Sequence, residues 1–140
     1  MVFGNLNLTS DAGKLGSERF DCIWVLVGEE ARHDPLERPV LQWLDWKMKG
    51  QIARLLKDAS VTGDRPIFIP TLMRLPTEYV ALEIGDDMDA PYFLRNCVGM
   101  KFQEVVCLTA DSKRTKQIER QIQQMPQGEF PEKVWFGVDG

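Results

Sequence analysis

The single histidine of the chain, His33, is the first residue that could support catalysis. A serine or cysteine nucleophile with a histidine base would have to use it, and a site with several histidine ligands cannot form within one chain. His33 follows an apolar run, residues 20–27, and α/β sheets place ligands at the carboxyl ends of such strands. A general base is therefore one interpretation. We favour a solvated loop histidine, because no nucleophile is indicated beside it.

Two loops carry carboxylates that could hold a divalent cation through oxygen ligands. One loop contains Glu29, Glu30, Asp34 and Glu37, and the other contains Asp86, Asp87 and Asp89. Each loop follows a predicted strand, so both could lie at one edge of a sheet. Their spacing lacks the alternating ligands and the central glycine of an EF-hand. We therefore predict solvated carboxylates without a metal, and Asp89 as the N-cap of the next helix.

The three cysteines, Cys22, Cys97 and Cys107, are odd in number and widely spaced. This pattern is typical of reduced thiols in a cytosolic protein. Cys22 and Cys107 fall in predicted buried strands, where a thiol serves as inert packing. We therefore predict no redox role for them.

A possible binding surface lies on the helix predicted over residues 40–57. Its core stripe is formed by Leu41, Leu44, Met48, Ile52 and Leu55. At 100° per residue, the opposite face carries Trp43, Trp46, Gly50 and Ala53, and a glycine in mid-helix is unfavourable without a packing reason. We interpret these residues as an interface, with the tryptophans as anchors and Lys47, Arg54 and Lys57 as its basic rim. The alternative is that a second helix or the N-terminal segment of the chain covers the tryptophans.

Length and composition narrow the class of protein. The chain has 140 residues, with 44% hydrophobic and 27% charged residues and a net charge of -4. One domain of ordinary size fits these values. The negative charge argues against nucleic acid or an anionic membrane as partner, because both need a positive surface. The basic residues 113–116 could still make a salt-sensitive contact with a partner.

The N-terminal residues and the apolar runs give no sign of a membrane or secreted protein. No run approaches the roughly 20 apolar residues that cross a bilayer. Residues 1–20 carry charges and have no apolar core, so they do not resemble a signal peptide. We therefore expect a cytoplasmic protein.

The order of predicted elements indicates an α/β fold with three layers, α/β/α, around a mixed and mostly parallel sheet. After a partly irregular segment, residues 1–17, with one edge-strand candidate at residues 6–8, strands alternate with helices. Strands are predicted over residues 20–27, 66–70, 78–84, 104–108 and 133–138, and helices over residues 40–57, 89–98 and 112–125. The two strands around residues 71–77 can pair as neighbours. We expect one domain over residues 1–140.

Several segments together resemble the amino-terminal domain of the leucine (cytosol) aminopeptidase family. They are DCIWVLVG, GQIARLLKDASVTGD, IFIPTLMRLPTEYVALEIGDD and FLRNCVGMKFQEVVCL, which lie within residues 20–108. The resemblance covers about two-thirds of the chain and implies a macro-domain-like fold. In that family a separate carboxy-terminal domain carries the two-metal peptidase site. Nothing in this sequence resembles its Asn-Thr-Asp-Ala-Glu-Gly-Arg motif, and 32 residues follow Leu108.

The resemblance implies an accessory domain that stands alone and has no peptidase activity. We expect a non-catalytic module for protein interaction, assembly or regulation, without cofactor or metal, whose long helix binds a protein partner or a second copy. The alternative is a macro-type domain that binds a nucleotide or ADP-ribose in the loops around residues 28–34 and 85–89. Against that alternative, the chain has no glycine-rich phosphate loop and its acidic loops would repel a pyrophosphate.

Overall fold

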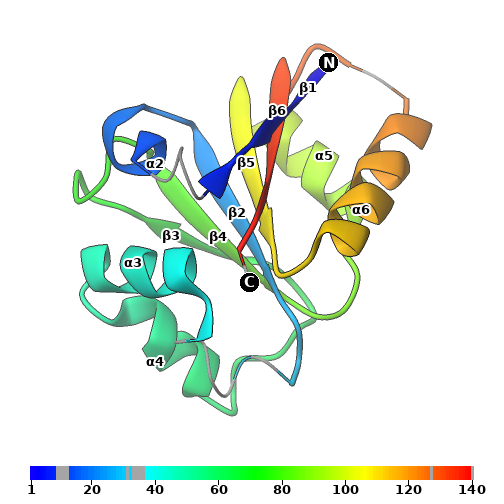
Figure 1. Cartoon of the computed structure of the whole chain (residues 1–140). Helices are drawn as coiled ribbons and strands as arrows, with labels where there is room; N and C mark the ends of the chain where they lie inside the picture. Colours follow the sequence, from blue (N-terminus) through cyan, green and yellow to red (C-terminus); the bar gives the residue numbers. More distant parts are fainter. Residues whose placement is uncertain (9–12, 31, 33–36, 127, 140) are drawn as a thin grey trace.

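Six strands form one sheet between two layers of helices in the computed structural model (Figure 1). The structure describes residues 1–8, 13–30, 32, 37–126 and 128–139. The strands are β1 (Val2–Leu6), β2 (Cys22–Val27), β3 (Ile67–Pro70), β4 (Tyr79–Ile84), β5 (Glu104–Thr109) and β6 (Lys133–Val138). The helices are α2 (Lys14–Ser17), α3 (Pro39–Lys47), α4 (Gln51–Lys57), α5 (Ala90–Gly99) and α6 (Ser112–Gln124).

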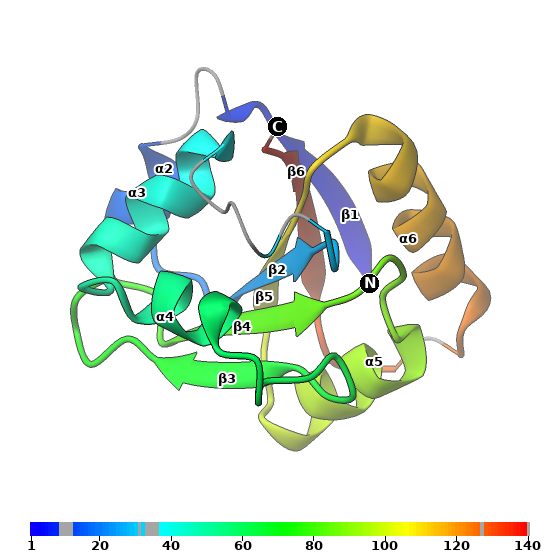
Figure 2. The same cartoon turned by 90° about the horizontal axis from the view of Figure 1, so that it is seen from below.

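The sheet has the strand order β1-β6-β5-β2-β4-β3. All neighbouring pairs are parallel except β3, which runs antiparallel to β4 at one edge. Helices α2, α3 and α4 cover one face and α5 and α6 cover the other (Figure 2). The predicted α/β class with a mixed, mostly parallel sheet in three layers is therefore confirmed.

Strand β2 shows why the sheet lies in the middle. All six of its side chains are buried, as expected for a parallel strand covered on both faces. Alternate residues join two separate cores: Ile23 and Val25 pack with the α3 and α4 side, whereas Trp24 and Leu26 pack with the α5 and α6 side. The continuous apolar run in the sequence reflects this two-sided burial.

The prediction of one long helix over residues 40–57 is wrong, because the structure has two helices there, α3 and α4. Lys49 (φ 57°) and Gly50 (φ 78°) adopt left-handed conformations between the two helices. The Gly50 N–H donates to the Asp45 carbonyl, which closes the end of α3, and the Asp45 carboxylate accepts the Ala53 N–H in the first turn of α4. Gly50 is therefore a helix-ending residue that relieves backbone strain, and it is not part of a mid-helix groove.

The other elements follow the predictions closely, with small shifts in their ends. Strands β2 to β6 and helices α5 and α6 lie where the sequence predicts them, and β3 and β4 pair as neighbours. Asp89 caps α5 by accepting the Tyr92 N–H. The edge strand near the N-terminus is β1, Val2–Leu6, so it begins earlier than the predicted residues 6–8. After the break at Gly50 the buried residues of α4 are Ile52 and Leu56, whereas Leu55 of the predicted stripe is only partly buried.

The topology places two sets of loops at opposite ends of the sheet. Helix α3 follows the carboxyl end of β2 and runs back along the sheet, so its last turn lies at the end where β4 begins. The β3–β4 connection, residues 71–78, lies at that same end, and the two segments are neighbours in both views (Figures 1 and 2). None of the described helices is both long and apolar enough to span a bilayer.

Candidate functional site

The two tryptophans predicted as a joint interface have different surroundings. Trp43 is half-buried and packs against the core, and a Cβ added to Gly16 of α2 would lie 3.1 Å from its ring. Helix α2 therefore packs against one edge of Trp43, while Trp43 also lines a pocket of about 310 Å³ with Leu8 and Val40. Trp46 is 69% exposed. Of the predicted interface residues, Trp46 has a largely exposed side chain, whereas Gly50 ends α3 and Ala53 is partly buried.

A second exposed apolar segment lies in the β3–β4 loop. Leu72 is 71% exposed and Met73 is 97% exposed. Both have left-handed backbone conformations, with φ of 53° and 68°. Such conformations cost a residue with a side chain roughly 1–2 kcal/mol each, so the loop displays two large apolar side chains at a conformational cost. We call Trp46, Leu72 and Met73 the amino-end surface, because the end of α3 and the β3–β4 loop lie at the end of the sheet where β4 begins.

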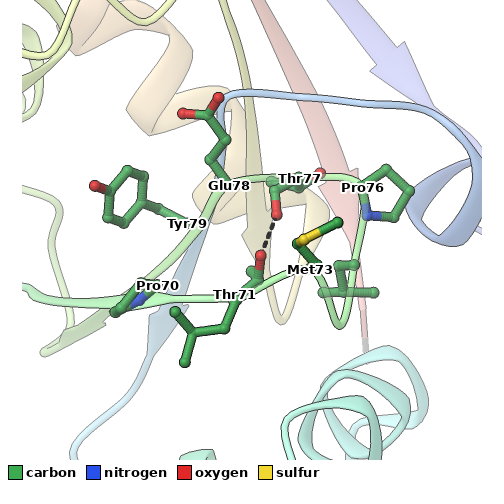
Figure 3. A pocket seen from close by; sticks show the side chains of 9 residues that line it. Pro70, Thr71, Met73, Pro76, Thr77, Glu78 and Tyr79 are labelled. Atoms are coloured by element: carbon green, nitrogen blue, oxygen red, sulfur yellow. Dashed lines mark hydrogen bonds between the residues drawn. The ribbon is translucent and has the colours of Figure 1, made fainter.

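Buried threonines hold the β3–β4 loop in place. The Thr71 hydroxyl donates to the Thr77 carbonyl at 2.6 Å (Figure 3). The Thr71 N–H donates to the Glu78 carbonyl. The Thr77 hydroxyl in turn accepts the Phe20 N–H. Both threonines are buried and Leu75 packs in the core, so buried contacts at the base of the loop hold its exposed tip in place.

A shallow groove of about 310 Å³ runs along this loop. Its lining is mainly apolar and includes Pro70, Leu72, Met73 and Tyr79. The carboxylate in the lining, Glu78, forms an ion pair with Arg19. An apolar side chain can therefore enter the groove without leaving the Glu78 carboxylate as an unpaired charge.

Basic residues lie beside the exposed tryptophan, in the turn after α3 and within the β3–β4 loop. The Lys47 ammonium lies 5.1 Å from the centre of the Trp46 ring, within cation–π distance. The exposed Lys49 begins the turn after α3, and Arg54 donates to its carbonyl. Arg74 directly follows Met73 in the loop. This end of the protein combines apolar side chains with positive charge.

A second hollow lies at the opposite end of the sheet, outside the carboxyl ends of β2, β4 and β5. We call it the carboxyl-edge crevice: it has a volume of about 570 Å³ and is lined by Leu26, Gly28, Glu30, Asp86, Ala110, Asp111 and Arg114. Strands β2 and β5 are neighbours whose connections leave to opposite faces of the sheet, through α3 and through α6. Crevices at such switch points are the usual ligand sites of open α/β sheets.

A buried arginine supports the floor of this crevice. Arg38 Nη1 donates to the Leu26 carbonyl at 2.8 Å, and Nε donates to the Asp139 carbonyl at 3.0 Å. The Asp139 carboxylate lies 3.4 Å from Arg38 Nε and accepts the N–H groups of Val40 and Leu41 at the start of α3. Burial lowers the pKa of Arg38, and the nearby carboxylate opposes that effect. Arg38 Nη2 is buried and has no hydrogen-bond partner among the described residues.

The wall of the crevice from α6 is polar and preformed. Asp111 caps α6 by accepting the Arg114 N–H, and the hydroxyls of Thr109 and Thr115 are 2.6 Å apart in the buried layer behind it. The Arg114 guanidinium lies 3.8 Å from the Asp86 carboxylate across the opening. The basic start of α6 predicted from residues 113–116 therefore places one cation in the crevice, where it faces carboxylates.

The predicted acidic loops meet only in part. Asp86 and Glu30 both line the crevice, as expected for loops that follow neighbouring parallel strands. Glu29 instead pairs with Arg32. Asp34 and His33 lie outside the described residues. Within residues 1–8, 13–30, 32, 37–126 and 128–139, no group of three or more ligand-type side chains could hold a metal ion.

The cysteines are buried, as predicted for Cys22 and Cys107, and Cys97 is buried with them. Burial raises the pKa of all three thiols, to about 12 for Cys97. A thiolate is the reactive form of cysteine, so these side chains are inert in the folded protein. They belong to the core between the sheet and α5.

Four residues that shape these sites were not singled out in the sequence. Arg38 and Asp139 are 101 positions apart, so no local pattern connects them. Leu72 and Met73 lie in a short loop with a left-handed backbone, and neither position carries the glycine or asparagine that would indicate one.

Comparison with known proteins found no matching family model and no matching curated protein.

Proposed function

We propose that the chain is a non-catalytic domain for protein interaction or assembly. The observation that carries this proposal is the amino-end surface: among the large apolar side chains that the structure describes, Trp46, Leu72 and Met73 have the greatest exposed fractions. Large aromatic and apolar side chains in such positions are typical binding anchors. The resemblance to the amino-terminal domain of the leucine aminopeptidases supports the same role, because that domain serves assembly and regulation. A cytoplasmic location is part of the proposal and fits three buried, unpaired thiols.

The test compares binding by the wild-type protein with binding by Trp46→Glu. Proteins captured by the immobilised wild type are purified and titrated against both forms, and the mass of each form is measured by light scattering. A matched control, Val2→Glu, places the same charge on another exposed apolar residue, in edge strand β1. The proposal predicts that only Trp46→Glu loses the partner or dissociates a self-assembled form. Equal binding and equal mass for all three forms would refute it.

A second candidate function is the binding of a small molecule such as a nucleotide or ADP-ribose in the carboxyl-edge crevice. The observation in its favour is the position of this crevice at the switch point between β2 and β5, with Arg114 and the start of α6 in its wall. Glu30 and Asp86 oppose the binding of a polyphosphate. Calorimetric titration with ADP-ribose distinguishes the candidates: saturable heat that Arg114→Glu abolishes supports this second function, whereas the interaction module gives no heat.

A further inference from the structure

We propose that the amino-end surface binds an acidic segment of another protein, and that the β3–β4 loop supplies the contacts that select it. This inference rests on the proposed interaction function and adds the class of partner. The segment would insert apolar side chains against Trp46, Leu72 and Met73 and set carboxylates against the surrounding cations.

The backbone of the loop points to a role for its side chains. Leu72 and Met73 occupy consecutive left-handed positions that glycine or asparagine would adopt with less strain. Their side chains are exposed, so packing within this chain does not explain them. Strained residues that expose apolar side chains at a fixed tip are characteristic of binding sites. The conformation therefore makes sense if these side chains are buried by a partner.

The support of the loop makes binding efficient. Thr71 and Thr77 are buried and hydrogen-bonded, and Leu75 is packed in the core. A surface fixed in this way loses little conformational freedom when a partner docks, so less of the contact energy is spent on ordering it. The neighbouring groove along Pro70 and Tyr79 offers space for one inserted apolar side chain.

Charge selects an acidic partner. Lys47 lies 5.1 Å from the Trp46 ring, Arg54 donates to the Lys49 carbonyl in the turn after α3, and Arg74 follows Met73, although the whole chain has a net charge of -4. Because Glu78 is paired with Arg19, these cations are not neutralised by that carboxylate. Complementary charge speeds association and suppresses partners of like charge. A segment with carboxylates beside leucine, phenylalanine or tryptophan matches both features.

The experiment selects binders from a phage-displayed library of random linear peptides on the immobilised wild-type protein. We expect the enriched peptides to carry more aspartate and glutamate than lysine and arginine, together with large apolar residues. A synthetic copy of one enriched peptide is then titrated against variants. Leu72→Asn/Met73→Asn keeps a backbone suited to the left-handed region, and we expect it to bind at least about tenfold more weakly, the effect of losing a hot-spot side chain.

Two further variants complete the test. Lys47→Glu/Arg74→Glu reverses the charge at the surface, and we expect a loss of about tenfold or more together with weakened dependence on salt. Val2→Thr/Val138→Thr makes two exposed apolar residues polar on the β1 and β6 side of the sheet and should bind as the wild type does. Circular dichroism confirms that each variant is folded.

The outcomes separate this inference from the function on which it rests. If Trp46→Glu abolishes peptide binding but the loop variant binds normally, the interaction function stands and the role of the loop is refuted. Enrichment of basic or uncharged peptides refutes the acidic partner. A wild-type dimer in light scattering that the loop variant dissociates assigns the surface to a second copy and also overturns the inference. The absence of any enriched peptide refutes the acidic linear partner, whereas the interaction function is refuted by equal partner binding and equal mass of the wild type, Trp46→Glu and Val2→Glu.

Discussion

Removal of the Asp139 carboxylate tests how the end of the chain is tied to the sheet and to α3. Asp139→Ala takes the acceptor from the N–H groups of Val40 and Leu41 and leaves the buried Arg38 without its counter-charge. An unpaired buried charge costs about 3–5 kcal/mol, and each unsatisfied amide costs about 1–3 kcal/mol. These costs overlap because one carboxylate serves all three groups. We therefore expect the free energy of unfolding to fall by about 3–5 kcal/mol.

Urea denaturation at neutral pH measures this loss, and an unchanged slope with denaturant shows that both forms unfold in the same way. Arg38→Met and the double variant complete a double-mutant cycle. We expect the loss in the double variant to be smaller than the sum of the two single losses, because Arg38→Met removes the stranded charge. A loss below about 1 kcal/mol for Asp139→Ala, or additive losses in the cycle, would refute the reasoning.

Three further predictions concern the loop, a buried carboxyl and the thiols. Met73→Asn should raise the melting temperature slightly, because asparagine tolerates the left-handed backbone better than methionine does; a lower melting temperature would show that the Met73 side chain packs within the fold. Burial raises the pKa of Glu83, so the folded form holds this proton more tightly than the unfolded chain. The contribution of Glu83 to stability should therefore fall as pH rises between the ordinary glutamate pKa, about 4.3, and the raised value, and Glu83→Gln should gain stability relative to the wild type over that range. Constant relative stability from acid to neutral pH would contradict this prediction. The three buried cysteines should react with a thiol reagent only as fast as the protein unfolds, and rapid labelling of the folded protein would contradict their burial.

Most of the fold could be predicted because its signals are local. The run at β2 is apolar on both faces, and Asp89 with Pro91 announces the start of α5. Strand β6 and the polar helix α6 also follow from their residue patterns. Such signals depend on burial and helix capping within a few residues, so a single sequence is sufficient to detect them.

The division between α3 and α4 does not follow from hydrophobic periodicity. The apolar stripe continues from Leu44 across Met48 to Ile52, so periodicity alone favours one helix. The structure instead uses Gly50 in a left-handed turn and the Asp45 carboxylate as a cap for α4. A glycine at this position is compatible with a groove on a continuous helix and with a left-handed residue that ends a helix, and periodicity does not distinguish the two.

The candidate sites were predictable only in part, because they depend on contacts between distant segments. Trp46 was found from its place opposite the core stripe, and its exposure agrees with that prediction. Trp43 lies on the same face as Trp46, but a helix wheel cannot show that α2 packs against it. Leu72 and Met73 were missed because neither residue type indicates a left-handed loop.

The central claim is that the amino-end surface is the binding surface of this domain. The most direct measurement is a map of ¹H–¹⁵N chemical shift changes when the purified partner or an enriched acidic peptide is added to the labelled wild-type protein. We predict that the largest changes fall at residues 46–49 and 72–74. Changes concentrated at residues 26–30, 86 and 110–114 would assign binding to the carboxyl-edge crevice and contradict the claim.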